Sequence, residues 1–275
     1  MTLLRRKLPT VMTAAALAAA FMTIGPVTAG AATNATCAGG SVPGGAYDSL
    51  TITGFCPIDS GLVEVRHNLT IAPGGALNAA FFGSNLKIGH DLLVGSSGIL
   101  VLGCEPFAFP CFNDPNAMNG GTEGMQTNDS IGHNLTSNQA TMVLLHHSSI
   151  KHNVVQSGGG DGVTCASQPL GPNGPPAYST YEDNTVGGNV SVVELGTCWA
   201  GFFRNTVWGN VTWNKNITAD EDGNEIATNT IHGSLSCFDN DPAVQFGDSQ
   251  GIPNIVFGEI RGQCTAVSTG PPPKA

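Results

Sequence analysis

Oxygen-bearing side chains concentrate in one short segment, Asp220-Glu221-Asp222-Gly223-Asn224-Glu225. Asp and Asn at alternate positions supply the hard oxygen ligands that Ca²⁺ prefers. The segment differs from an EF-hand loop because its glycine stands at the fourth position and not at the sixth. It predicts a calcium site formed by Asp220, Asp222 and Asn224, and a solvated acidic turn is the alternative.

Histidines are the second group that could do chemistry. Four of them share one position of a repeated pattern: His67, His90, His133 and His152. A row of imidazoles is able to bind a metal or to respond to pH, but we favour a row that only stacks at a corner of the repeat. His146 and His147 are adjacent, so on a strand they face opposite sides and cannot form one site.

One motif suggests a serine nucleophile. Residues 247–251, Gly-Asp-Ser-Gln-Gly, match the Gly-x-Ser-x-Gly elbow, which needs a strand, a sharp turn and a helix. The surrounding sequence has no helical pattern, so we expect Ser249 to lie in an ordinary turn. No Ser-His-Asp set can be assembled from the spacing, and the catalytic residues stay unassigned.

Aromatic side chains form a cluster that could contact sugars. Its members are Trp199, Phe202, Phe203, Trp208 and Trp213. Trp208 stands at an outward position of the repeat described next, which suits contact with a carbohydrate. Packing in the core and between coils is the alternative, and we favour it for most of the five.

A short repeated unit defines the elements that must carry these residues. It consists of a branched apolar residue, any residue, Gly or His, a small polar or acidic residue, and Val, Leu or Ile. Its eight copies begin at Val65, Ile88, Ile131, Ile150, Val186, Val207, Ile231 and Val256. Copies are 19 to 25 residues apart, except for spacings of 43, close to two periods, and 36, one period with an insertion. The period is near 22 residues.

This period predicts a solenoid. Apolar residues on both sides of a Gly/His–Asn step suit two short strands that meet at a corner, where Gly and Asn accept left-handed backbone. One unit cannot bury its apolar stripe alone, so coils must stack about 4.8 Å apart. A further asparagine stands two residues before four of the copies, as Asn184, Asn205, Asn229 and Asn254. Asparagines at equivalent corners can form a ladder of amide hydrogen bonds.

The Asn-x-Val-x-Gly-Asn-Val units resemble those of the pectate-lyase-like superfamily of parallel β-helices, over roughly residues 50–264. The resemblance implies an all-β, right-handed parallel β-helix of about 8–10 coils. The Ala-rich N-terminus and sparse charge resemble those of exported proteins of high-GC Gram-positive bacteria. The superfamily includes polysaccharide lyases, glycoside hydrolases, adhesins and uncharacterised surface proteins, so the resemblance implies no single activity.

The resemblance also implies what an enzyme of this kind would need. Polygalacturonase-type hydrolases use clustered aspartates with a histidine and an Arg-x-Lys pair, whereas Asp239 and Asp241 here have no Arg-x-Lys beside them. Lyases use a cationic base, and Arg204 and Lys215, near the acidic segment, are the best available set. An arginine beside an acidic cluster on adjacent coils, or a groove with two carboxylates, would favour an enzyme.

Composition suggests the boundaries of the domains. Residues 5–7, Arg-Arg-Lys, precede an Ala-rich apolar stretch that ends in Ala29-Gly30-Ala31, so we expect residues 1–31 to be a signal peptide. A lead-in (32–49), the β-helix (50–264) and a flexible Pro-rich tail (265–275) follow. Two loop insertions near 103–129 and 157–181 interrupt the period, and such insertions often lie on the binding face of a solenoid.

All eight cysteines lie beyond the expected cleavage site. An even number of cysteines in an exported chain implies disulfides. If neighbours in the sequence pair, the disulfides are Cys37–Cys56, Cys104–Cys111, Cys165–Cys198 and Cys237–Cys264. This pairing is a prediction from locality alone.

Composition also limits the function. A formal net charge of −10 over 275 residues argues against nucleic acid as a partner. We expect a secreted protein with no membrane attachment after cleavage, no cofactor apart from calcium, and polysaccharide or the cell envelope as partner; the oligomeric state stays open. The expected function is non-catalytic, structural or carbohydrate-contacting, and a polysaccharide lyase or glycoside hydrolase is the alternative.

Overall fold

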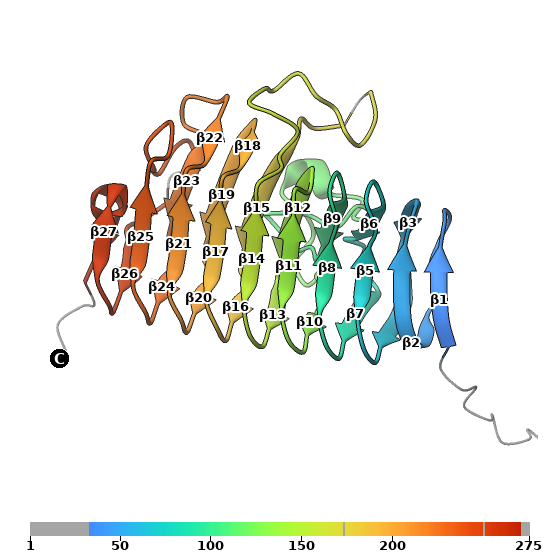
Figure 1. Ribbon diagram of the computed structural model, residues 1–275. Coiled ribbons are helices and arrows are strands. Elements are labelled where there is room, and N and C mark those ends of the chain that lie inside the picture. The colour runs from blue at the N-terminus through green and yellow to red at the C-terminus, as the bar shows by residue number, and fades with distance from the viewer. Residues whose placement is uncertain (1–32, 173, 250, 271–275) are drawn as a thin grey trace, which may run out of the picture. The chain divides into compact units, whose positions relative to one another are not determined.

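Parallel strands that stack along one axis make up nearly all of the regular secondary structure of the described residues (Figure 1). The computed structural model describes residues 33–172, 174–249 and 251–270. The expected signal peptide lies outside these residues. Within them, no helix is long and apolar enough to cross a membrane.

Each full coil contributes strands to three series. The first comprises β4 (Gly61–Val65), β7 (Ser84–Ile88), β10 (Asp129–Ile131), β13 (Ser148–Ile150), β16 (Thr185–Val186), β20 (Thr206–Val207), β24 (Thr230–Ile231) and β26 (Asn254–Val256). The second comprises β5 (Leu69–Ile71), β8 (Leu92–Val94), β11 (Leu135–Asn138), β14 (Val154–Ser157), β17 (Val190–Val193), β21 (Val211–Asn214), β25 (Leu235–Phe238) and β27 (Ile260–Gly262). The third comprises β3 (Phe55–Pro57), β6 (Ala76–Ala79), β9 (Ile99–Leu102), β12 (Met142–His146), β15 (Tyr178–Glu182), β19 (Trp199–Phe203) and β23 (Asn224–Ala227).

These series close into an all-β parallel β-helix, the predicted fold. The first two series, with β1 (Thr33–Cys37), β2 (Gly45–Ile52) and β28 (Ser268–Thr269), form one 19-stranded sheet. The third series forms a seven-stranded sheet, here called sheet B. Two further strands, β18 (Gly196–Thr197) and β22 (Ile217–Thr218), form a small separate sheet.

The register keeps like residues in line from coil to coil. Leu69 pairs with Leu92, and Leu92 pairs with Leu135, so that all three point into one continuous apolar core. Because Leu92 and Leu135 are direct neighbours, the 43-residue spacing between their copies is one coil with an insertion. The reading of that spacing as close to two periods was therefore wrong.

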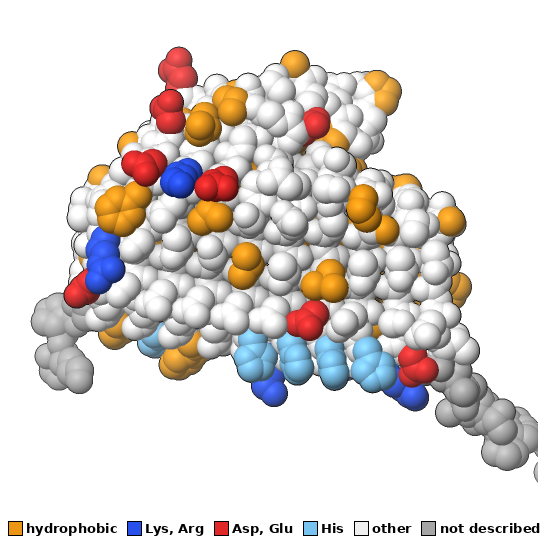
Figure 2. Space-filling view, viewed as in Figure 1, with side chains coloured by type: hydrophobic (Ala, Val, Ile, Leu, Met, Phe, Trp, Pro, Cys, Tyr) orange, Lys and Arg blue, Asp and Glu red, His pale blue; other side chains and the backbone are white. Residues whose placement is uncertain are grey.

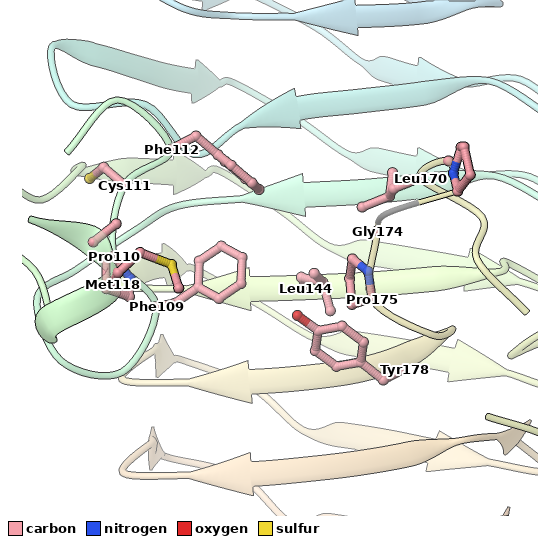
Figure 3. A pocket seen from close by; sticks show the side chains of 13 residues that line it. Phe109, Pro110, Cys111, Phe112, Met118, Leu144, Leu170, Gly174, Pro175 and Tyr178 are labelled. Carbon is pink, nitrogen blue, oxygen red and sulfur yellow. The ribbon is translucent and has the colours of Figure 1, made fainter. Parts of the chain in front are cut away.

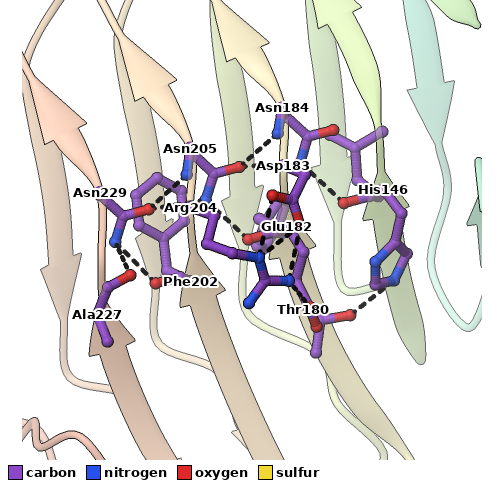
Figure 4. A network of polar contacts seen from close by, with 12 residues as sticks. His146, Thr180, Glu182, Asp183, Asn184, Phe202, Arg204, Asn205, Ala227 and Asn229 are labelled. Atoms are coloured by element: carbon purple, nitrogen blue, oxygen red, sulfur yellow. Dashed lines mark hydrogen bonds and ion pairs between the residues drawn. The ribbon is translucent and has the colours of Figure 1, made fainter. Parts of the chain in front are cut away.

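Ladders of side-chain amides run along corners of the coil, as predicted. In the buried ladder, the Nδ2 group of Asn184 donates to Asn205 Oδ1 over 3.0 Å, and Asn205 donates in the same way to Asn229 (Figure 4). In the outer ladder, Asn153 donates to Asn134 Oδ1 over 3.0 Å. These bonds satisfy polar groups at bends where the strand ladders are interrupted.

The β-helix extends beyond both predicted boundaries. At the N-terminal end, β1 already pairs with β2, inside the expected lead-in. At the C-terminal end, the 3₁₀ helix η2 (Gln263–Val267) extends into the expected flexible tail, and β28 lies within it. Val267 is buried and β28 pairs with β26, and these contacts hold the segment on the last coil.

Four disulfides join the cysteines in the order expected from locality: Cys37–Cys56, Cys104–Cys111, Cys165–Cys198 and Cys237–Cys264. The second lies within the first insertion, and the third ties the second insertion to the coil at Cys198. The fourth fastens η2 to β25. Disulfides in this number indicate a non-reducing environment.

Candidate functional site

Both insertions pack on the outer side of sheet B. On β12, Val143 and Leu145 point into the core, whereas Met142 and Leu144 belong to a second apolar cluster outside the coil. Residues of both insertions contact this outer cluster, among them Phe109 and Leu170. Outward residues of a solenoid strand are normally solvated, so burial of a whole strand marks this face as different from the others.

An apolar cleft of about 680 Å³ opens between the two insertions (Figure 3). The first insertion supplies Phe109, Phe112 and Met118, the second supplies Leu170 and Pro175, and the floor is formed by Leu144 and Tyr178 of sheet B. Burial raises the pKa of the Tyr178 hydroxyl to about 12, so this group stays protonated at neutral pH and is available as a donor. The cleft therefore has the composition of a site for a hydrophobic group with one polar contact.

An ion-pair cluster is built at the corner that follows sheet B. Asp183 and Arg204 occupy equivalent positions on adjacent coils, and both adopt positive φ, 55° and 54°. Arg204 Nε donates to Asp183 Oδ2 over 2.7 Å, and its Nη2 donates to Glu182 Oε2 over 2.7 Å (Figure 4). The guanidinium thus bridges two carboxylates of the preceding coil.

Glu105 of the first insertion completes this cluster. Its side chain lines an opening of about 350 Å³ together with Asp183 and Arg204. The residue is 8% exposed, and burial together with the adjacent Asp183 carboxylate raises its pKa to about 9. Glu105 Oε1 finds no hydrogen-bond donor among the described residues. At neutral pH the carboxyl is protonated and can itself donate to Asp183.

Glu182 and His146 lie deeper in the same region. Burial raises the pKa of Glu182 to about 7, although the Arg204 guanidinium opposes the shift. His146 is fully buried under the ring of Phe109, with centroids 4.0 Å apart, and burial lowers its pKa to about 3. The imidazole is therefore neutral and shielded from solvent, which is unsuited to a general base.

Acidic side chains gather at a set different from the predicted calcium ligands. Asn224 points into the core, where its Oδ1 accepts a hydrogen bond from Trp213 Nε1. The carboxylates of Asp222, Glu225 and Asp248 instead lie within 4.8 Å of one another and could hold a cation. Partial burial and the neighbouring Asp222 raise the pKa of Asp220. Calcium binding stays a prediction, and in the cluster of carboxylates Glu225 and Asp248 stand in place of the predicted Asp220 and Asn224.

The proposed lyase set is not brought together. Arg204 is engaged by Glu182 and Asp183, and Lys215 Nζ lies 3.5 Å from Glu194 on another corner. Neither cation contacts the acidic segment at 220–225. Asp239 and Asp241 flank Asn240, which belongs to a third amide ladder with Asn216 and Gln263.

The remaining predicted residues occupy structural positions. The four repeat histidines form a continuous row, with ring centroids 4.7 to 5.4 Å apart. His146 and His147 diverge, as expected, since His147 Nδ1 contacts the Thr127 carbonyl oxygen. Ser249 lies in a turn, and its backbone N–H donates to Glu225 Oε2. Of the five clustered aromatics, Phe202 and Trp213 are in the core, whereas Trp208 is exposed.

The carboxyl groups beside Arg204 were not predicted as a site. Asp183 and Arg204 directly precede Asn184 and Asn205, so alignment of the repeats would have placed them on adjacent coils. Glu105 had no such signal, because it belongs to an insertion without a period.

No family model, curated protein or solved structure matches this chain.

Proposed function

We propose that this protein is secreted and acts as a non-catalytic binding protein for extracellular polysaccharide or the cell envelope, with the apolar cleft receiving a hydrophobic substituent of its ligand. Acyl or aryl groups carried by a glycan have this chemistry. The observation that carries the proposal is the 680 Å³ apolar cleft formed by both insertions over sheet B. Membership of the pectate-lyase-like superfamily is part of the same proposal and rests on the repeat.

Two further features support binding without catalysis. Both sides of the Arg204 guanidinium are occupied by carboxylates, and these partners raise its pKa, so it cannot serve as the base of a lyase. Glu105 and Asp183 line one opening with Arg204, and the adjacent Asp183 carboxylate helps to raise the pKa of Glu105. The cluster then serves to fix the first insertion, one wall of the cleft, to the coil.

The cleft is tested by Phe112→Ala. Phe112 is a half-exposed wall residue, and its removal takes apolar contact from the ligand, so we expect affinity for an acylated polysaccharide to fall about tenfold. Calorimetric titration with acetylated and deacetylated forms of one glycan measures this effect. Phe55→Ala, a similarly exposed phenylalanine outside the cleft, is the matched control. Equal affinity for the two glycan forms, or equal loss in both variants, would sink the proposal.

A hydrolase is the second candidate, favoured by an arginine that lies beside several carboxyl groups, one of which, Glu105, has a pKa raised to about 9. In that reading, Glu105 donates a proton to the leaving group and Asp183 activates water. Release of reducing ends from a polysaccharide by the wild-type chain, abolished in Glu105→Gln, would establish it and exclude the non-catalytic reading. Absence of products from a broad panel argues for binding alone.

A further inference from the structure

One position of the repeat recurs on successive coils along the outer corner of the β-helix, and a stack of aromatic side chains at this position stops where a coil has glycine. The row of residues at this position is formed by the second residue of each repeat copy: Arg66, Gly89, Gly132, Lys151, Gly187, Trp208, His232 and Phe257. Each of them from Gly89 onward donates its backbone N–H to the preceding coil in the same way, as Trp208 does to the Val186 carbonyl oxygen. The members are therefore in register, one per coil.

Three planar rings at one end of this row stack face to face. The rings of Trp208 and His232 are 4.1 Å apart at 4°, and those of His232 and Phe257 are 5.1 Å apart at 9°. Trp208 is 59% exposed although one of its faces is covered by His232. Its other face is directed at the preceding coil, where the equivalent residue, Gly187, has no side chain.

The fold keeps that position empty. A Cβ atom on Gly187 would lie 2.2 Å from the carbonyl oxygen of Lys151, so a side chain cannot be added there without a shift of the backbone. A groove of about 430 Å³ results, bounded by Trp208, Gly187 and Lys151 and floored by Ser149 and Thr185. With coils about 4.8 Å apart, the levels of Trp208 and Lys151 are separated by about 9.6 Å, which leaves room for one ring.

Lys151 is the one charged residue among the described residues that line the groove, although the protein as a whole is acidic. Arg66, Arg204, Lys215 and Arg261 are paired with carboxylates, whereas Lys87 and Lys151 have no ion pair among the described residues. Lys87 lies one coil from Ser130, another residue that lines the groove. The histidine row runs along the same edge, with basic side chains close to it (Figure 2). Two acids lie on the first strand series: Glu64 is the register partner of Lys87, and Asp129, which directly precedes Ser130, is buried, and its burial raises its pKa to about 7.

We propose that this groove binds a planar aromatic ring that carries a carboxylate. The ring lies at the level of Gly187 and continues the stack of Phe257, His232 and Trp208. Its carboxylate contacts the ammonium group of Lys151, and the hydroxyls of Ser149 and Thr185 border the ring edge. The site lies on the corner between the first two strand series, so it does not depend on the cleft over sheet B.

Calorimetric titration of the mature chain with 2-naphthoate tests the site. We expect saturable binding at one site, weaker binding of cyclohexanecarboxylate, which has the charge without the planar ring, and weaker binding of 2-naphthylmethanol, which has the ring without the charge. Glucuronate distinguishes a carboxylated sugar from an aromatic acid. Binding of cyclohexanecarboxylate or glucuronate as tight as that of 2-naphthoate would overturn the proposal.

Two variants locate the binding. Trp208→Ala should weaken binding roughly two- to tenfold, as expected for loss of one aromatic pair. Lys151→Gln, a change at an exposed side chain, should weaken it by about two- to fivefold. Phe257→Ala at the far end of the stack is the control and should leave affinity unchanged, and Phe112→Ala should have no effect either. Wild-type affinity in both Trp208→Ala and Lys151→Gln would place the ligand elsewhere and refute the site.

Discussion

At corners of the coil, asparagine side chains supply the hydrogen bonds that strand pairing supplies elsewhere in the fold. At the corner after sheet B the backbone turns through a left-handed residue, and backbone groups on both sides of this residue, the Asn184 N–H and the Tyr181 carbonyl oxygen, bond to an asparagine side chain. Asn205 compensates with both ends of its amide: Oδ1 accepts from Asn184, and Nδ2 donates to the Tyr181 carbonyl oxygen and to Asn229. The residue is buried, so each of these bonds replaces one that water cannot supply.

Asn205→Ala should therefore destabilise the protein by about 3 kcal/mol, because at least two buried backbone groups lose their partner. Asn210→Ala, in the exposed outer ladder, is the matched control and should cost about 1 kcal/mol or less. Urea unfolding followed by circular dichroism measures both. Equal losses of unfolding free energy in the two variants would mean that burial does not determine how much a ladder asparagine contributes to stability.

At the scale of elements, the insertions turn one face of a regular solenoid into a cleft. Strand β12 is buried on both sides, and its outer residues Leu144 and Met142 are covered by chain that does not belong to the repeat. Between the end of β14 and the start of β15, the residues of the second insertion that the structure describes form no helix or strand, and Cys165–Cys198 is the covalent anchor of this segment. The shape of the cleft thus depends on a disulfide rather than on strand pairing.

Replacement of Cys165 and Cys198 by serine should lower stability by about 3 kcal/mol, because the bond closes a loop of 33 residues. It should also weaken binding of an acylated glycan, since one wall of the cleft is released. The double serine variant at Cys37 and Cys56 removes a disulfide far from the cleft in the sequence and should lower stability without loss of binding. Equal affinity of the two double serine variants for the acylated glycan would contradict a role of Cys165–Cys198 in shaping the cleft.

At the scale of the whole molecule, stability is coupled to pH through the buried carboxyls. Glu105 and Glu182 have pKa values raised to about 9 and about 7, above the ordinary 4.5 of an unfolded glutamate. Between pH 4.5 and the raised pKa of each group, the folded state binds more protons than the unfolded state. Unfolding then becomes easier as pH rises.

We expect the free energy of unfolding to fall as pH rises from about 5 to 9, most steeply below pH 7, where both Glu105 and Glu182 are protonated in the folded state and ionised in the unfolded state, and less steeply above it, where only Glu105 still differs. Glu105→Gln keeps the shape and hydrogen-bonding capacity of the protonated acid but cannot ionise, so it should flatten the upper part of this curve. Urea unfolding at a series of pH values gives the measurement. A variant whose profile parallels that of the wild type would show that Glu105 does not titrate in this range.

The repeat alone specified the fold because each coil obeys the same local rule: apolar residues inward, glycine or asparagine at corners. The disulfides followed from locality because each closes over one coil or one loop, as Cys237 and Cys264 do. The side chains that gather near the acidic segment could not be identified in the same way. Whether Asn224 or Glu225 points outward depends on the register of β23 against β19, and this register places Asn224 beside Ala200 in the core.

The sequence by itself thus determined the period, the strands, the ladders and the pairing of cysteines, all of which are set by contacts between one coil and the next. Only the tertiary structure decided that both insertions cover sheet B, that Glu105 meets Asp183 and Arg204, and that the ring stack stops at Gly187. The reason is physical. An insertion has no period to fix its path, so its position is chosen by the apolar surface on which it packs.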